Sequence, residues 1–155
     1  MRVVIPAPLV DEIRRHGEAT YPEECCGFLV ARDAPPGDGQ PRRILRVAPM
    51  ENQMDTERGR RFIIRPDELR RFEKSLEGAG EVLVGFYHSH PDHPAVPSRF
   101  DEEHAWPWYT YLVLAVDHGG AAELGAFELD PDERHFRPVG WAHTSDDLGS
   151  AVHRG

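Results

Sequence analysis

The sequence lacks the features that mark membrane, secreted and disulfide-stapled proteins. Its longest apolar stretch, 112-LVLAV-116, is far shorter than the roughly 18 residues of a membrane-spanning helix. The N-terminal residues MRVVIPAPLV lack the apolar core of a secretory signal. The two cysteines are adjacent, Cys25 and Cys26, in neither disulfide nor metal-ligand spacing. These absences predict a cytoplasmic protein without disulfides or membrane partners.

An excess of positive charge is also missing, because the formal net charge is −9 at pH 7. Basic residues do cluster in 58-RGRR-61 and at Arg70 and Arg71, but acidic residues surround both clusters. Proteins that bind nucleic acid gather lysine and arginine against the phosphates. The composition therefore argues against a nucleic-acid partner.

The length of 155 residues suits one domain with its own core and is too short for two. We expect that domain over residues 1–141. Residues 142–155 have no periodicity and few large apolar side chains, so they predict a disordered tail. The proline- and glycine-rich stretch 34–41 predicts a surface turn.

Hydrophobic periodicity predicts a mixed protein. Apolar residues at helical spacing indicate helices over 8–17, with Gly17 as the C-cap, and from Pro66 to about Leu76. A shorter helix is expected over 98–105. Apolar or alternating runs indicate strands over residues 25–31, 43–47, 61–64, 81–88, 109–117 and 122–130. The fold class is therefore α+β, with a curved, mostly antiparallel sheet flanked by two or three helices.

The segment 87-YHSHPDHPAVPSRFD-101 carries the densest chemistry. Side chains alternate along an extended chain, so His88 and His90 project to the same side at the end of an apolar strand. A carboxylate as third ligand would leave one position open, as in catalytic zinc sites. That carboxylate is either the nearby Asp92 or Asp101, at the far end of the proline-rich loop.

The local run 88-HSHPDH-93 matches the H-x-H-x-D-H pattern of hydrolases with the metallo-β-lactamase fold. In that pattern Asp92 and His93 would serve a second metal. However, that fold needs a longer chain and further histidine and aspartate ligands downstream, and only 62 residues follow His93 here. This interpretation is the weaker one.

At longer range the residues form HSHP, six residues, and then S-x-x-D, ending at Asp101. This pattern resembles the signature of the JAMM (MPN-plus) family of zinc metallopeptidases, in its small stand-alone prokaryotic form. The segment 21-YPEECCGFLV-30 resembles the region where the family carries an upstream glutamate. The order of elements agrees from residue 1 to about 140, so the resemblance implies the MPN/JAMM-like (cytidine-deaminase-like) fold.

The resemblance also implies a role for each residue of the pattern. His88, His90 and Asp101 would bind one Zn²⁺, Glu24 would be the general base, and the Ser98 hydroxyl would hydrogen-bond the tetrahedral intermediate. The implied activity is hydrolysis of the peptide or isopeptide bond after the C-terminal glycine of a ubiquitin-like or sulfur-carrier protein. Iron or manganese are alternatives to zinc with these ligands.

Several alternatives stay open from the sequence. Glu23 competes with Glu24, and only the match favours Glu24. Ser98 and Asp101 also fit a helix capping box, and a carboxylate turned back to its own N-cap is expected to be poorly placed for zinc. Two further functions are a non-catalytic scaffold of the same fold that binds ubiquitin-like partners and a zinc hydrolase of another small substrate. Scaffolds of this family typically lack the metal ligands.

Overall fold

The computed structural model describes residues 2–33, 40–52, 64–144 and 152–154, the last three by their backbone alone. The predicted turn over 34–41, the basic cluster 58–61 and the strand expected over 61–64 lie mainly outside these residues. The elements are β1 (Val3–Pro6), α1 (Ala7–Thr20), β2 (Cys26–Arg32), β3 (Arg42–Arg43), β4 (Arg46–Met50), α2 (Pro66–Ser75), β5 (Glu81–Pro91), α3 (Arg99–Glu103), β6 (Thr110–Asp117), β7 (Gly120–Leu129), β8 (Phe136–Val139), β9 (Trp141–Thr144) and β10 (Val152–Arg154).

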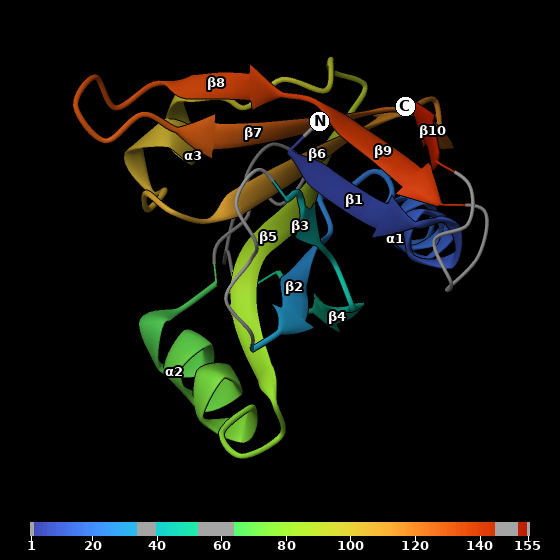
Figure 1. Ribbon diagram of the computed structural model, residues 1–155. Coiled ribbons are helices and arrows are strands. Elements are labelled where there is room, and N and C mark those ends of the chain that lie inside the picture. The colour runs from blue at the N-terminus through green and yellow to red at the C-terminus, as the bar shows by residue number, and fades with distance from the viewer. Residues whose placement is uncertain (1, 34–39, 53–63, 145–151, 155) are drawn as a thin grey trace.

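The strands form two sheets. The larger has the order β4-β2-β5-β6-β7-β8 and is antiparallel except between β5 and β6. The smaller has the order β10-β9-β1-β3, with β1 parallel to both of its neighbours. Figure 1 shows α2 beside the lower end of β5, and α3 where β7 ends and β8 begins. The expected α+β class with a mostly antiparallel sheet is confirmed.

The larger sheet is buried on both faces. Along β2, Phe28 and Val30 pack into one apolar cluster, whereas Leu29 and Ala31 pack into the other. This division follows from the alternation of side chains along a strand. Because both faces are covered, β2 is a continuous apolar run in the sequence.

Helix α1 ends at Thr20, three residues beyond the predicted end, because Gly17 is not its C-cap. Leu9, Val10 and Ile13 are buried on the same helix as Gly17. A Cβ atom at Gly17 would lie 2.7 Å from Leu114 Cδ2 on β6. The glycine therefore permits a close approach between helix and sheet, and the helix continues to Thr20.

The short strands β1, β8, β9 and β10 were not predicted, and β10 lies within the segment expected to be a disordered tail. β9 falls where the sequence indicated the beginning of a tail, yet it pairs in parallel with β1 from Val3↔Trp141 to Pro6↔Thr144. Ala142 and Thr144 are buried there.

Across the described residues we find no helix with the length and apolar character of a membrane span.

The parallel junction of β5 with β6 supplies a test of the packing. A Cβ atom at Gly85 would lie 1.9 Å from the Thr110 carbonyl oxygen. We expect Gly85→Ala to lower the free energy of unfolding by about 1–3 kcal/mol, or to prevent folding, because backbone atoms must move apart. Gly120→Ala is the control, since its Cβ would lie 3.6 Å from the nearest such atom, the Asp117 carbonyl oxygen. Equal urea denaturation midpoints for the two variants would contradict this packing.

Candidate metal centre

The C-terminal end of β5 brings two histidines to one point. β5 is paired on both sides there, with His88 opposite Cys26 of β2 and opposite Val113 of β6. His88 and His90 are both buried, and their Nε2 atoms lie 3.2 Å apart. The expectation that alternation places both imidazoles on the same side therefore agrees with the structure.

Asp101 reaches the same point from α3. Its Oδ2 atom lies 3.0 Å from His88 Nε2 and 3.2 Å from His90 Nε2, and the side chain is buried. Three potential ligand atoms thus lie within 3.2 Å of one another, on two elements separated by the proline-rich loop.

The Asp101 carboxylate is also part of a capping box. The Ser98 N–H donates to Asp101 Oδ2 at 2.7 Å, and the Asp101 N–H donates to Ser98 Oγ at 3.1 Å. The expectation that the cap and a metal-ligand position exclude each other is wrong. The oxygen that accepts the cap hydrogen bond is the one that faces the histidines, so the cap orients it.

The spacing of these three atoms suits a metal ion. Zinc binds imidazole nitrogen and carboxylate oxygen at about 2.0–2.2 Å, so tetrahedral ligands stand about 3.3–3.5 Å apart. The three observed separations, 3.0, 3.2 and 3.2 Å, are only slightly shorter. Two imidazoles and a carboxylate are also donors that zinc accepts. The residues present therefore fit a bound divalent cation.

Hydrogen bonding prepares the histidines and the carboxylate for this role. His90 Nδ1 lies 3.1 Å from the Pro94 carbonyl oxygen, which can only accept, so Nδ1 carries the hydrogen. Nε2 of neutral His90 is then the lone-pair atom that faces the site. Burial alone would raise the pKa of Asp101, but His88, His90 and the Ser98 N–H outweigh it and hold that pKa well below its usual range.

Glu24 lies beside the histidines with its side chain 3 % exposed. One carboxylate oxygen of Glu24 and one ring nitrogen each of His88 and His90 all lie within 4.8 Å of one another. Its Oε1 atom accepts no hydrogen bond from the part of the chain that the structure describes. Burial raises the pKa of Glu24 to about 8, although His90 opposes this rise. Glu23 is exposed, so Glu24 is the acid at the site.

Two polar residues that the sequence did not single out hold the backbone at Glu24. Ser89 Oγ accepts the Cys25 N–H at 2.8 Å, and Asn52 Nδ2 donates to the Glu24 carbonyl oxygen at 3.3 Å. Ser89 could have been inferred, because a buried serine between two strand histidines must find a partner. Asn52 carries no such signal.

The remaining polar candidates of the sequence do not join the centre. Asp92 Oδ2 accepts the Tyr21 hydroxyl at 2.6 Å, and Asp92 Oδ1 accepts the His118 N–H at 2.7 Å. His93 is exposed. His104, also exposed, has its Nδ1 2.9 Å from the Phe100 carbonyl oxygen. These side chains belong to the surface of the loop and of α3.

Both cysteines are buried free thiols. Burial raises the pKa of Cys25 to about 11 and that of Cys26 further still. A thiol that stays protonated at neutral pH is a poor nucleophile. The cysteines are therefore packing residues beside the site.

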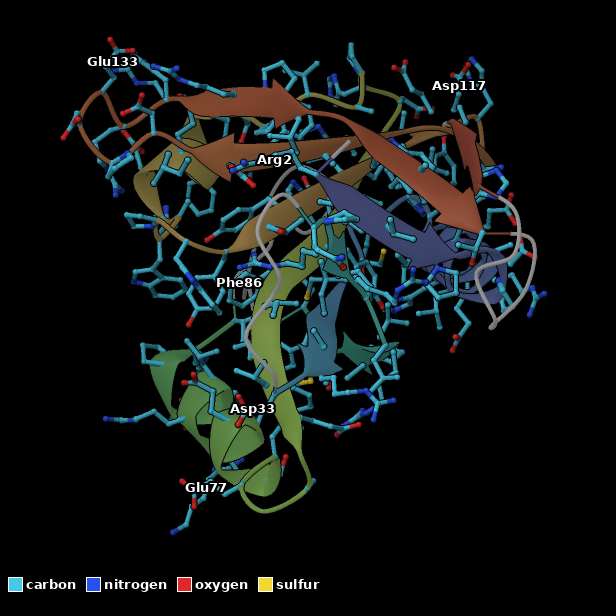
Figure 2. The ribbon with its side chains drawn as sticks, viewed as in Figure 1. Arg2, Asp33, Glu77, Phe86, Asp117 and Glu133 are labelled. Carbon is cyan, nitrogen blue, oxygen red and sulfur yellow. The ribbon has the colours of Figure 1, made fainter. Side chains whose placement is uncertain are left out.

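A cleft of about 420 Å³ opens next to the centre and is bordered by His88 and Asp101. Its walls are mainly apolar and include the aromatic rings of Phe86 of β5, whose position Figure 2 marks, and of Trp106. Trp106 and Trp108 are 43 % and 61 % exposed. Tyr109 is half-buried and packs against the core, as predicted. The cleft thus offers an apolar approach to His88 and Asp101.

The family model described as prokaryotic homologs of the JAB domain matches residues 6–129, and the chain belongs to that family. The resemblance to the JAMM family is thereby confirmed. The chain is 37% identical over 137 residues to a desampylase from Haloferax volcanii, covering 85% of this chain and 91% of that protein. It is 36% identical over 129 residues to a CysO-cysteine peptidase from Mycobacterium bovis, covering 82% of each.

Solved structures share the fold of this chain. The protein DSY2949 from Desulfitobacterium hafniense superposes with a TM-score of 0.76 at 25% identity, over 93% of this chain and 94% of that one. A JAB1/MPN domain protein from Archaeoglobus fulgidus superposes with a TM-score of 0.52 at 13% identity, over 91% and 98%. The second likeness concerns the fold alone. The family and the buried group of Glu24, His88 and His90 together fit a metal site.

The raised pKa of Glu24 makes the stability of the metal-free protein depend on pH. Glutamate in an unfolded chain has a pKa near 4.5, and burial raises it to about 8, so folding takes up a proton between these values. The stability present below pH 4.5 is therefore lost as the pH rises towards 8. We expect Glu24→Gln to stabilise the metal-free protein at pH 8 by on the order of 2–4 kcal/mol, and by little at pH 5.

Urea denaturation of chelator-treated protein at both pH values measures this difference. Glu23→Gln is the matched control, because its side chain is exposed and should change stability little at either pH. A stabilisation by Glu24→Gln that is the same at pH 5 and pH 8 would show that the buried carboxylate is not its cause.

Proposed function

We propose that the protein is a zinc-dependent JAMM-type peptidase that cuts the peptide or isopeptide bond after the C-terminal glycine of a ubiquitin-like or sulfur-carrier protein. One observation carries the proposal: His88, His90 and Asp101 converge on a single point, with the buried carboxylate of Glu24 beside it. The names of the relatives, a desampylase and a CysO-cysteine peptidase, support the substrate class.

Each residue then has a chemical task. Zinc held by two neutral imidazoles and a carboxylate would supply a positive charge and an open position that lowers the pKa of water towards about 7. Glu24 takes the proton of that water at a carboxylate oxygen and passes it to the leaving amine. Burial raises the pKa of Glu24 to about 8 in the metal-free protein. A divalent cation beside it would lower that pKa and so favour the carboxylate, which is the form that accepts a proton.

Ser98 has a second task besides the cap. Its Oγ accepts the Asp101 N–H, and a hydroxyl can donate its own hydrogen at the same time. That hydrogen is suited to the oxygen of a carbonyl under attack, where negative charge develops.

Two features of the surface suit an extended glycine-ended tail. The apolar cleft leads to His88 and Asp101, and β4 is the outer strand of the larger sheet in the described structure. β4 ends at Met50, opposite Cys26 and so close to Glu24. An extended peptide can add to such an edge through main-chain hydrogen bonds. We place this activity in the cytoplasm, where the free thiols of Cys25 and Cys26 stay reduced.

Intact-mass measurement on a panel of carrier proteins tests the activity. Each carrier ends in two glycines that are joined to a peptide, to a lysine side chain or to cysteine. We expect the zinc-loaded protein to reduce the mass to that of the free carrier. Glu24→Gln should keep one zinc per chain yet lower the rate by about 10²–10⁴-fold, because the proton acceptor is lost. Glu23→Gln should turn over normally.

Each departure from these results has a specific meaning. Retained turnover in Glu24→Gln would remove Glu24 from the mechanism. An unchanged mass across the panel, with zinc bound, would contradict the substrate class and favour another small substrate. A folded protein without zinc affinity would favour the non-catalytic scaffold.

Zinc stoichiometry of loop variants tests the ligand set. We expect Asp101→Ala to lose at least about 100-fold in zinc affinity, because one of three protein ligands is removed. Asp92→Ala and His93→Ala should bind zinc like the unmodified protein. The Asp92 carboxylate accepts hydrogen bonds from Tyr21 and His118 and not from the centre, and the His93 side chain is exposed. The reverse result would restore the interpretation in which Asp92 and His93 serve a metal.

A further inference from the structure

Helix α3, which carries Asp101, is too short to be stable alone. It spans five residues, Arg99–Glu103, and isolated helices of that length do not persist in water. Its N-terminal end is closed by the capping box of Ser98 and Asp101. Its last carbonyl groups need partners from outside the helix.

Arg134 supplies those partners from the turn between β7 and β8. Its Nη2 atom donates to the carbonyl oxygens of Glu102 at 3.2 Å, Glu103 at 3.4 Å and Ala105 at 3.2 Å. Figure 1 shows this hairpin turn beside α3. One guanidinium nitrogen therefore collects three carbonyl groups at the C-terminal end of the helix.

A second contact joins the same two segments. Glu102 Oε2 accepts the Phe136 N–H at 2.8 Å, and its other oxygen lies 3.3 Å from His135 Nδ1. Glu102 directly follows Asp101 in the chain. The hairpin thus holds α3 through the main chain and through the residue next to the ligand.

The backbone conformation at residue 134 is unfavourable for arginine, which indicates that the Arg134 side chain has a role. Its φ angle is +58°, in the left-handed region that glycine and asparagine adopt most readily. Its N–H donates to the Asp130 carbonyl oxygen at 2.9 Å, which closes the turn. A glycine would suit this turn better, so the arginine side chain offsets a backbone cost.

We propose that Arg134 is a positioning residue of the metal centre, which holds Asp101 against His88 and His90 by binding the C-terminal carbonyl groups of α3. The inference rests on the proposed function, in which Asp101 is a metal ligand. Arg134 acts through α3 and contacts neither histidine in the hydrogen bonds of the described residues.

The direction of the change in zinc affinity distinguishes a positioning role of Arg134 from an effect of its charge. A guanidinium near a divalent cation repels it, so removing the charge alone would strengthen zinc binding. Removing a residue that positions a ligand weakens binding, typically by about 10–100-fold. The two effects predict opposite changes in affinity.

The variant Arg134→Gly is the sharpest test, because glycine removes the side chain and relieves the backbone of the turn. We expect its zinc affinity, measured by competition with a chromophoric chelator, to fall about 10–100-fold. The thermal midpoint of the metal-free protein should change little. Arg134→Lys should keep most of the affinity, because an ammonium group carries three donors and can serve three carbonyl oxygens around one point.

Arg137→Gln is the matched control. Arg137 lies in the same hairpin and pairs with Asp130 at 2.5 Å, and no described hydrogen bond or ion pair joins it to α3. We expect it to bind zinc like the unmodified protein. Unchanged or stronger zinc binding in Arg134→Gly would overturn the proposal. An equal loss of zinc affinity in Arg137→Gln would also overturn it. So would a fall in the stability of metal-free Arg134→Gly that is large enough to account for its weaker zinc binding.

If Arg134→Gly does not fold, Arg134→Lys is compared with Arg134→Gln, which is too short to reach the three carbonyl groups. Equal zinc affinities for that pair would overturn the proposal. Absence of zinc binding by the unmodified protein would overturn both this proposal and the proposed function. If the zinc affinities of the variants follow the expected order but no carrier is cleaved, Arg134 remains a positioning residue and only the peptidase activity is rejected.

Discussion

The constraint on which the structure depends is the convergence of two imidazole nitrogens and a carboxylate oxygen within 3.2 Å in a buried place. Such atoms come together only where a cation or a shared proton lies between them and where the fold prevents their separation. β5 meets this demand because β2 and β6 pair with it on both sides at His88. Gly85 permits the parallel contact with β6 that fixes the position of the strand.

Two carboxylates border the same histidine pair and are held in opposite states. Asp101 receives the Ser98 N–H and faces both imidazoles, so its pKa stays low although it is buried. Glu24 is equally withdrawn from water but receives no such donor on Oε1, so burial raises its pKa to about 8. Separated pKa values of neighbouring acids distinguish a group that stays charged from one that exchanges a proton. The two imidazoles, His88 first, and after them the Ser98 N–H lower the pKa of Asp101, whereas at Glu24 burial outweighs the effect of His90.

The sequence predicted those features that depend on local periodicity or on a compact motif. His88 and His90 follow from alternation along one apolar strand, and Asp101 and Glu24 follow from the resemblance. The strands β1 and β9 could not be inferred, because each is four residues long and the pairing between them joins residues more than 130 positions apart. Gly17 was misjudged as a C-cap because its reason for being glycine, the approach of Leu114, is a tertiary contact.

The supporting residues of the site were hidden for the same reason. Asn52 and Arg134 act through main-chain carbonyl groups at distant positions, and no local pattern connects residue 134 with residues 102–105. The capping box was visible, but it was taken as a competitor of the metal site. A local motif and a tertiary site can share one atom when the geometry of the cap points that atom at the site.

If Asp101 binds the metal as proposed, that shared atom couples the stability of α3 to the affinity for the metal. Asp101 Oδ2 accepts the cap hydrogen bond and also faces the two histidines. Contacts at the N-terminal cap and at the carbonyl groups bound by Arg134 both order α3. In the proposed site, this order would reduce the conformational entropy that Asp101 loses when it binds a metal. By linkage, a bound metal orders α3 by the same free energy. On the proposal that Arg134 positions Asp101, the β7–β8 hairpin would belong to the metal centre in energetic terms, although it would contribute no ligand.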